Sequence, residues 1–438
     1  MCPRNALAWL DEHVNLEAIG VPVGADRRAT GPTLDRIRAL VELLGSPQLS
    51  YPALHLTGTN GKTSVAHMTT ALLVHSGLTV GSYTSPHLER VNERMAWNDE
   101  PIDDATFAEV LGVVADVEPH LADRLSYFEI LTGAALSWFA DLAVDVAVVE
   151  VGLGGTWDAT NVVDGAVAVV TNVSVDHVEY LGPTREDIAS EKAGIVKPGS
   201  TLVLGETDPG LAQRFLDRGA ERVVTRGVDF GVRASRLAHG GRLVDLYAPE
   251  GGRYDEVLLP LHGAHQAENA AAALAAVEAF LGAALSRDVV AEAFASVRSP
   301  GRLEVAGHAP LVLLDGAHNV AGAHALRVAL AEEFPDAPRV LVVGLLRQKE
   351  PHEMLEALGA TDAARLVCCR PPSPRGIDPA IVAEAARDLG VDSDRIDVVD
   401  LVEEAVVRAL AVTAPDEQVI VTGSLYVVGA ARHALSHH

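Results

Sequence analysis

The chain has 438 residues, 48% of them hydrophobic, which is typical of a globular protein with two or three domains. Its formal net charge of −26 argues against a general nucleic-acid binder or a protein that coats an anionic membrane. No apolar run approaches transmembrane length, and the three cysteines lack metal-type spacing, so we expect a cytoplasmic, reducing location and no membrane partner.

Residues 1–50 are expected to form two helices, and the first chemical motif follows them. A short apolar run, 53–56, enters Gly58-Thr59-Asn60-Gly61-Lys62-Thr63, and a helical pattern, 64–76, leaves it. Glycines let the backbone approach a polyphosphate, and the N–H groups of the loop and helix N-terminus attract its charge. We expect Lys62 to reach the outer phosphates and Thr63 to face Mg²⁺. An ordinary strand–turn–helix with a surface lysine is the alternative interpretation.

Polar residues follow the ends of three further predicted strands. Ser85 and His87 come after strand 79–84, Glu150 ends the apolar run 144–150, and His177 follows strand 166–171. Ligands of open α/β sheets bind at the carboxyl ends of strands, and a carboxylate there commonly holds the metal of P-loop enzymes. A polar turn, a surface acid and a satisfied loop histidine are the respective alternatives.

Lysine is rare, because only four of the 34 basic residues are lysines: Lys62, Lys192, Lys197 and Lys349. A chain that otherwise uses arginine is expected to keep lysine where a compact or reactive amine is needed. Lys192 lies on a short predicted helix, 185–193, where a salt-bridged surface lysine is the alternative.

The remaining chain is expected to contain alternating short strands and turns over 200–260, with a small hairpin insert, and then an alanine-rich helix that begins at His265. A boundary is expected near residues 298–301. Beyond it, strands and helices alternate from 311 to 435, which predicts a second doubly wound α/β domain. Its first strand, 311–315, ends at Asp315 with His318 close behind.

Without reference to any family, these features predict an ATP- and Mg²⁺-dependent enzyme with two α/β domains. Tyr127, Phe128 and Trp157 could stack against a flat substrate. Catalytic groups on two domains suggest a ligase that brings three substrates together.

Seven motifs together resemble the folylpolyglutamate synthase/dihydrofolate synthase family of the Mur ligase superfamily, over nearly the whole chain. They are GTNGKT (58–63), TSPHL (84–88), EVGLGG with DATN (150–155 and 158–161), DH (176–177), EKAGIVKPG (191–199), GRLE (301–304) and DGAHN (315–319).

The resemblance implies an α/β fold: an N-terminal P-loop ATPase domain of the Mur-ligase type with the pterin site, 1–298, and a C-terminal Rossmann-like ligase domain, 299–438. It implies ligation of L-glutamate to a pterin-borne carboxylate through an acyl phosphate, with ATP, dihydropteroate or tetrahydrofolate, and L-glutamate as substrates, by a monomer. Two Mg²⁺ sites are implied, one of them held in part by a carbamylated Lys192.

The resemblance also assigns residues to roles. The implied catalytic residues are Lys62, Lys192 and His318; the metal ligands are Ser85, Glu150 and His177; the ATP contacts are Thr59, Asn60, Gly61, Lys62, Thr63, Asn269, Arg302 and Asp315; and the pterin contacts are Ser126, Tyr127, Phe128, Glu129, Trp157, Asp158 and Ala159.

Three departures from the family pattern concern substrates. Thr156 stands where many relatives have arginine, and the N-terminal element 32–36 lacks the Gly-Leu pair often seen there; both bear on pterin specificity. The loop 345–350, which differs from the commoner Lys-Asp-Lys-Asp type, bears on the glutamate end. Three alternatives stay open: a ligase limited to one of the two folate reactions, another Mur-type amide ligase such as a cell-wall enzyme, and a P-loop NTPase that acts as a switch.

Overall fold

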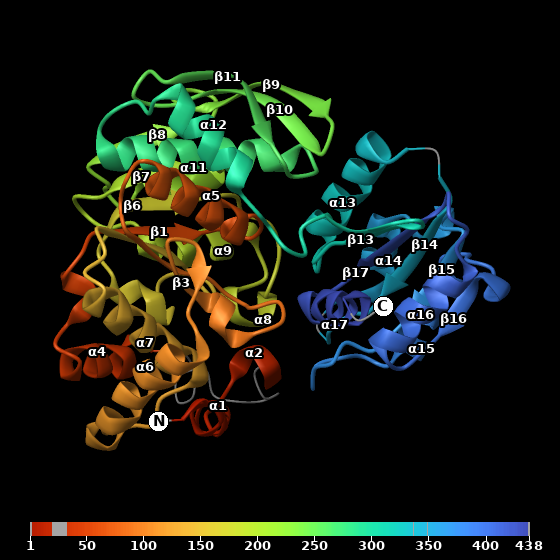
Figure 1. The fold of residues 1–438 in the computed structure, drawn as a ribbon, viewed down its shortest axis with the longest axis horizontal. Helices are drawn as coiled ribbons and strands as arrows, with labels where there is room; N and C mark the ends of the chain where they lie inside the picture. Colours follow the sequence, from red (N-terminus) through yellow and green to blue (C-terminus); the bar gives the residue numbers. More distant parts are fainter. Residues whose placement is uncertain (1, 20–32, 336, 348, 437–438) are drawn as a thin grey trace. The chain divides into compact units, whose positions relative to one another are not determined.

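The computed structural model describes residues 2–19, 33–335, 337–347 and 349–436. They divide into two compact units. The first contains most of the chain up to Val297; the second contains Arg298–His438 together with the short segments 239–241 and 261–265. Figure 1 gives the labels of the elements.

The first unit is built on an eight-stranded sheet with the order β4-β3-β2-β5-β1-β6-β7-β8. Strand β1 runs through the middle, parallel to β5 and β6, with Leu56 opposite Glu150. This order places the ends of β1, β5 and β6 side by side, so the three polar loops that follow them meet at one edge. The strands are β1 Ala53–Thr57, β2 Val80–Tyr83, β3 Met95–Trp97, β4 Glu100–Pro101, β5 Val146–Glu150, β6 Gly165–Val170, β7 Thr201–Leu204 and β8 Arg222–Thr225.

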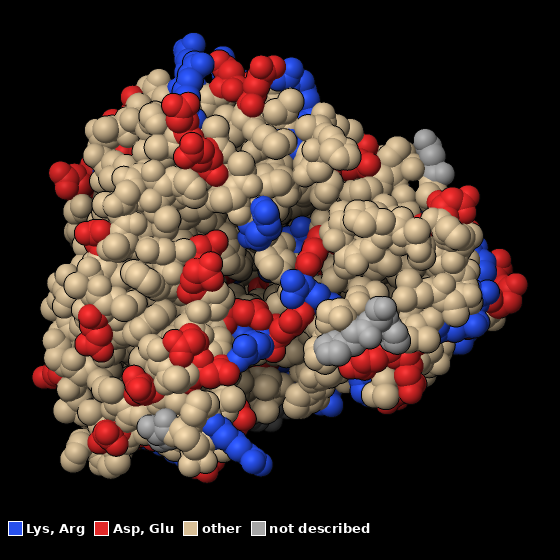
Figure 2. All heavy atoms as spheres, viewed as in Figure 1, with Lys and Arg blue, Asp and Glu red and all other residues tan. Residues whose placement is uncertain are grey.

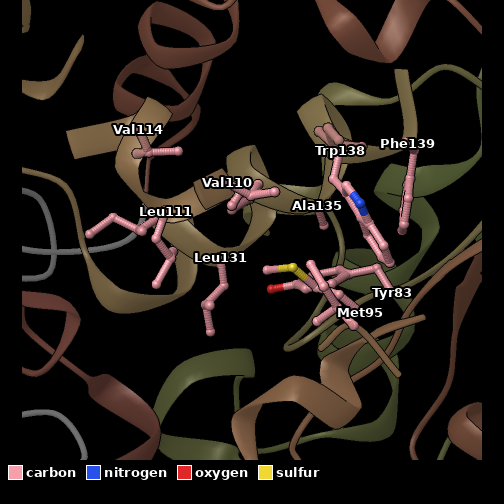
Figure 3. Close-up of a cluster of buried hydrophobic side chains, with 14 of the residues drawn as sticks. Tyr83, Met95, Val110, Leu111, Val114, Leu131, Ala135, Trp138 and Phe139 are labelled. Atoms are coloured by element: carbon pink, nitrogen blue, oxygen red, sulfur yellow. The ribbon is translucent and has the colours of Figure 1, made fainter. Parts of the chain in front are cut away.

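The first unit contains eleven described α-helices. They are α1 Pro3–Asp11, α2 Leu16–Ile19, α4 Leu34–Leu43, α5 Lys62–His75, α6 Asp104–Val117, α7 Tyr127–Asp141, α8 Val178–Leu181, α9 Arg185–Lys192, α10 Pro209–Leu216, α11 His265–Leu281 and α12 Arg287–Ser296. Helices α6 and α7 bury their apolar sides in one cluster with Tyr83 and Met95 from β2 and β3, which Figure 3 shows. This burial of apolar surface fixes α7, and therefore the segment at its N-terminus.

Two expectations for this unit were wrong. Residues 2–19 and 33–50 contain three described α-helices, α1, α2 and α4, instead of the two expected for 1–50. Segment 200–260 is not only strands and turns, because α10 lies within it. Asp208 caps that helix, Pro209 opens it, and Leu211 and Phe215 bury one side, a combination that favours a helix over a turn. The expected hairpin is a three-stranded antiparallel sheet of β9 Gly231–Ala238, β10 Gly241–Tyr247 and β11 Arg253–Leu259.

The second unit has a six-stranded sheet with the order β12-β13-β17-β14-β15-β16. The predicted strand–helix alternation is confirmed to within about two residues. An antiparallel edge strand, β12, was missed; it pairs with β13 after the turn at Pro310. The elements are β12 Glu304–His308, β13 Leu311–Leu314, β14 Arg339–Val343, β15 Arg365–Cys368, β16 Ile396–Val398 and β17 Gln418–Thr422, with α13 Val320–Glu333, α14 Pro351–Leu358, α15 Pro379–Asp388, α16 Val402–Val412 and α17 Leu425–Leu435.

Acidic and basic side chains are interspersed over the face shown in Figure 2. Within the described ranges, no helix has both the length and the apolar character needed to cross a membrane.

Candidate functional site

The glycine loop between β1 and α5 is held in a conformation that requires glycine. Gly61 caps α5 with a φ of +84°, and a Cβ there would lie 2.5 Å from Oδ1 of Asn269. A Cβ on Gly58 would lie 1.8 Å from the hydroxyl oxygen of Thr171. The loop is therefore packed between α11 and the end of β6, and Asn269, a predicted ATP contact, lies against it.

Segment 171–174, which follows β6, anchors the glycine loop. The backbone oxygen of Asn60 accepts hydrogen bonds from the Thr171 hydroxyl at 2.7 Å and the Asn172 amide at 2.9 Å, and Asn60 N–H donates to Asn172 Oδ1 at 3.1 Å. Thr59 bonds in both directions with the backbone of Ser174. The sequence interpretation missed Thr171 and Asn172; the signal was their position directly after a buried strand.

Two lysines that lie 130 positions apart meet at this loop. Nζ of Lys62 donates to the carbonyl oxygens of Gly58 at 3.0 Å and Thr59 at 3.3 Å, and Nζ of Lys192 donates to Gly58 at 2.8 Å. Burial, and then the nearby Lys62 ammonium, lowers the pKa of Lys192 to about 7. Much of the Lys192 amine is therefore neutral near physiological pH, and a neutral amine is a nucleophile.

Glu150, at the end of β5, joins two of the predicted motifs. Its carboxylate accepts the Thr63 hydroxyl at 3.0 Å and the backbone N–H of Ser85 at 3.2 Å. Glu150 is almost wholly buried, and so is Ser85. A carboxylate and two hydroxyls next to a phosphate-binding loop are oxygen donors of the type that Mg²⁺ prefers.

His177 follows Asp176 on the segment after β6. Its backbone is left-handed, with a φ of 50°, which is uncommon for a residue other than glycine. Asp176 is buried and accepts the N–H of His177 at 2.8 Å. Among the described residues, no three His, Cys, Asp or Glu side chains form a metal-holding group; the predicted set of Ser85, Glu150 and His177 contains only two such side chains.

The predicted pterin residues belong to two segments that touch. At the start of α7, Ser126 and Glu129 bond to each other, and Glu129 also accepts Nε of Arg36 at 3.0 Å. The Tyr127 ring lies under the Arg94 guanidinium, 5.8 Å from its centroid. The Phe128 ring reaches the second segment, because a Cβ on Gly152 would lie 2.5 Å from it.

The second segment, 152–159, is also tightly bonded. Asp158 is buried; it accepts the N–H of Leu153 at 2.8 Å and that of Thr160 at 3.0 Å. Burial raises the pKa of Asp158, and these hydrogen bonds oppose that shift. Ala159 is buried at the start of a 3-10 turn, and Trp157 is half-buried. Thr156 donates its hydroxyl to the Glu191 carbonyl at 3.0 Å.

The remaining predicted residues form their own cluster in the second unit. Asp315, at the end of β13, accepts the N–H groups of Leu303 and Ala317, both at 2.8 Å. Burial raises the pKa of Asp315, and the charge of nearby Arg302 opposes this. Nδ1–H of His318 donates to the Gly316 carbonyl at 2.9 Å. In the loop 345–350, Gln348 lies outside the described residues.

Two family descriptions match the chain: the Mur ligase middle domain over residues 56–277 and the Mur ligase glutamate ligase domain over residues 301–425. The dihydrofolate synthase/folylpolyglutamate synthase of Mycobacterium tuberculosis is 42% identical over 92% of this chain and 89% of its own length.

Solved structures of similar proteins contain nucleotide and metal. The folylpolyglutamate synthase of M. tuberculosis with ADP has a TM-score of 0.90 at 38% identity, covering 99% of this chain and 98% of that one. An Escherichia coli relative with DHPP and ADP scores 0.85 at 29% identity, with 99% and 98% coverage. The bifunctional enzyme of Yersinia pestis with AMPPNP and a Mn ion scores 0.83 at 28% identity, with 100% and 98% coverage.

Proposed function

The chain belongs to the folylpolyglutamate synthase/dihydrofolate synthase family of Mur ligases, and we propose that it joins L-glutamate to both dihydropteroate and tetrahydrofolate. It is an ATP-dependent glutamate ligase. The relative from M. tuberculosis, whose name covers both reactions, supports the bifunctional assignment, since it aligns with nearly the whole chain.

The reaction runs in two steps. A carboxylate oxygen of the pteroyl substrate attacks the γ-phosphorus of ATP, which forms an acyl phosphate and releases ADP. The amine of L-glutamate then attacks the acyl carbon and expels phosphate, so an amide forms and the amine loses a proton. Since phosphoryl transfer depends mainly on positioning and charge neutralisation, this chain has to supply cations and aligned hydrogen-bond donors.

The glycine loop would hold the phosphates of ATP. Gly61 contributes its position at the α5 N-terminus, where the helix N–H groups attract phosphate, and Lys62 contributes a positive charge. Thr59 and Asn60, which segment 171–174 holds in place, are proposed to line the phosphate site, and Asn269 borders the loop. Thr63, Ser85 and Glu150 fit a divalent cation by their oxygen chemistry, and His177 completes the proposed set. When bound, Mg²⁺ neutralises charge on the transferring phosphoryl group.

Lys192 is proposed to carry a carbamate. Its neutral amine attacks CO₂ through nitrogen, a C–N bond forms, and the nitrogen loses a proton to solvent. The product is a carboxylate that can share a second Mg²⁺. The depressed pKa of about 7 supports this chemistry, because only the unprotonated amine reacts. Arginine could not replace lysine here.

The pteroyl substrate is proposed to bind where the start of α7 meets segment 152–159, with Phe128 and Trp157 as ring contacts and Ser126, Tyr127, Glu129, Asp158 and Ala159 around them. In the second unit, Arg302 and Asp315 are proposed to contact ATP and His318 to act near the reacting phosphate or the incoming glutamate.

The observation that carries the proposal is the arrangement at the glycine loop. Lys62 and Lys192 meet at Gly58, and Thr63 bonds to Glu150. An NTPase that served as a switch would need the loop and a metal ligand, but not a second buried amine on it.

Phosphate release from ATP, measured with L-glutamate plus either dihydropteroate or tetrahydrofolate, tests the proposal. We expect release with both acceptors. Release with only one acceptor would restrict the enzyme to a single activity. Stimulation by neither would overturn the folate assignment, and release without any acceptor or glutamate would favour the NTPase.

A further inference from the structure

His55 lies on β1, three residues before the glycine loop, and its side chain is completely buried. Its Nε2 lies 2.9 Å from the Thr160 hydroxyl oxygen. Its Nδ1 is buried and has no hydrogen-bond partner in the described part of the chain. A buried polar atom without a partner lowers stability, so a histidine here is not explained by packing alone.

The hydrogen bonds made by the Thr160 hydroxyl determine which atom is the donor in its contact with His55. The Thr160 hydroxyl donates to Oδ1 of Asp158 at 2.5 Å. A hydroxyl has one hydrogen, so towards His55 it must accept, and Nε2 of His55 must carry the proton. Burial, followed by the charge of Lys197, lowers the pKa of His55 to about 3, so the ring stays neutral over the working pH range.

This relay, the chain of hydrogen bonds from His55 through Thr160 to Asp158, ends on segment 152–158. The other oxygen of Asp158 accepts the N–H of Leu153 at 2.8 Å. Thr57, two residues after His55 and on the same side of β1, donates its hydroxyl to the Gly154 carbonyl at 2.9 Å. Strand β1 therefore holds the segment at two points, directly through Thr57 and indirectly through Thr160.

The segment has little room to move on its other side. A Cβ on Gly155 would lie 2.8 Å from the carbonyl oxygen of Lys192 and 2.9 Å from that of Glu191. The position of the segment is thus tied to the backbone that carries Lys192.

We propose that His55 is a positioning residue whose Nε2–H orients the Thr160 hydroxyl, so that Asp158 holds segment 152–158 in the conformation that receives the pteroyl substrate. The inference rests on the proposed function, because it takes Trp157, Asp158 and Ala159 to border that substrate.

The test compares His55→Leu, which removes the donor and the unpartnered nitrogen, with His55→Gln, whose amide can place an N–H where Nε2 lies. We expect His55→Leu to raise KM for dihydropteroate about tenfold, with KM for ATP unchanged, and His55→Gln to restore most of the loss. A purely structural role predicts no KM change in His55→Leu, and that result would overturn the proposal.

A stability cycle tests the relay without any substrate. Thr160→Val leaves the His55 N–H without its acceptor and removes the hydroxyl that donates to Asp158, so it should lower stability. His55→Leu should be neutral or stabilising, and the double variant should be more stable than Thr160→Val alone. If the stability change of the double variant equalled the sum of the two single changes, the relay from His55 to Asp158 would be overturned. If wild-type enzyme released no phosphate with either pteroyl acceptor, the proposed function would fail, while this cycle would still decide whether the relay exists.

Discussion

Lys62 and Lys192 donate to the same acceptor, the carbonyl oxygen of Gly58, at 3.0 and 2.8 Å. Two amines at one oxygen repel each other when both are protonated, so one proton is lost more easily than usual. Burial is the larger cause and acts in the same direction, so the pKa of Lys192 falls to about 7 beside the phosphate-binding loop.

Lys192 should make stability depend on pH. The folded amine has a pKa of about 7 and the ordinary value is 10.5, so between these values unfolding takes up a proton and stability rises with pH. In CO₂-free buffer, we expect wild-type to gain about 3 kcal/mol relative to Lys192→Met between pH 7 and 10. All four tryptophans precede residue 158, so their fluorescence during urea unfolding reports on the first unit. Lys349→Met, the control, should retain the wild-type pH dependence.

Glu150 should determine how much Mg²⁺ the enzyme needs for phosphate release. Glu150→Gln keeps an oxygen for Thr63 but loses the negative charge, so the Mg²⁺ concentration for half-maximal phosphate release should rise at least about tenfold, with a roughly 100-fold lower kcat. Glu278→Gln is the control, because Glu278 is also buried but bonds to Tyr254 at 2.6 Å, near the three-stranded sheet. Equal Mg²⁺ curves for wild-type and Glu150→Gln would contradict the assignment.

Gly77 is a matched control for Gly61 of the glycine loop, because the two glycines share a backbone conformation but differ in their surroundings. Their φ values are +84° and +88°, but an added Cβ meets Asn269 Oδ1 at 2.5 Å at Gly61 and nothing within 4 Å at Gly77. Gly77→Ala should cost about 1 kcal/mol of stability from the backbone alone. Gly61→Ala should cost more and weaken ADP binding, measured by calorimetry. An unchanged ADP affinity in Gly61→Ala would show that the loop does not hold the nucleotide.

The ion pair of Arg94 with Glu17 should be costly to break, because Arg94 is buried. The Arg94 side chain is 2% exposed, donates to both oxygens of Glu17, at 3.0 and 2.5 Å, and bonds to Nδ1 of His87 at 2.9 Å. Glu17→Ala leaves this buried charge without its carboxylate, and we expect a loss of about 3–5 kcal/mol in urea unfolding. Arg90→Ala breaks an exposed pair with Asp104 and should cost under about 1 kcal/mol. Similar losses of stability in Glu17→Ala and Arg90→Ala would contradict this prediction.

The sequence by itself determined the glycine loop, the parallel strands that end in polar residues and the alternation of elements in the second unit. Each of these depends on local patterns: glycine spacing, β-branched runs and helical periodicity. Local patterns were insufficient at α10, where turn-forming residues served as a helix cap, and at β12, a short half-buried edge strand with little apolar alternation.

Only the tertiary structure decided which of the polar groups meet. Lys192 reaches Gly58, Asn172 anchors Asn60, and His55 reaches Asp158 through Thr160 because β1 lies between β5 and β6. Strand order follows from how whole layers bury their apolar faces, and no short window of sequence contains that information. The rarity of lysine indicated that Lys192 was unusual, but its buried position beside Lys62 gives the amine its chemistry.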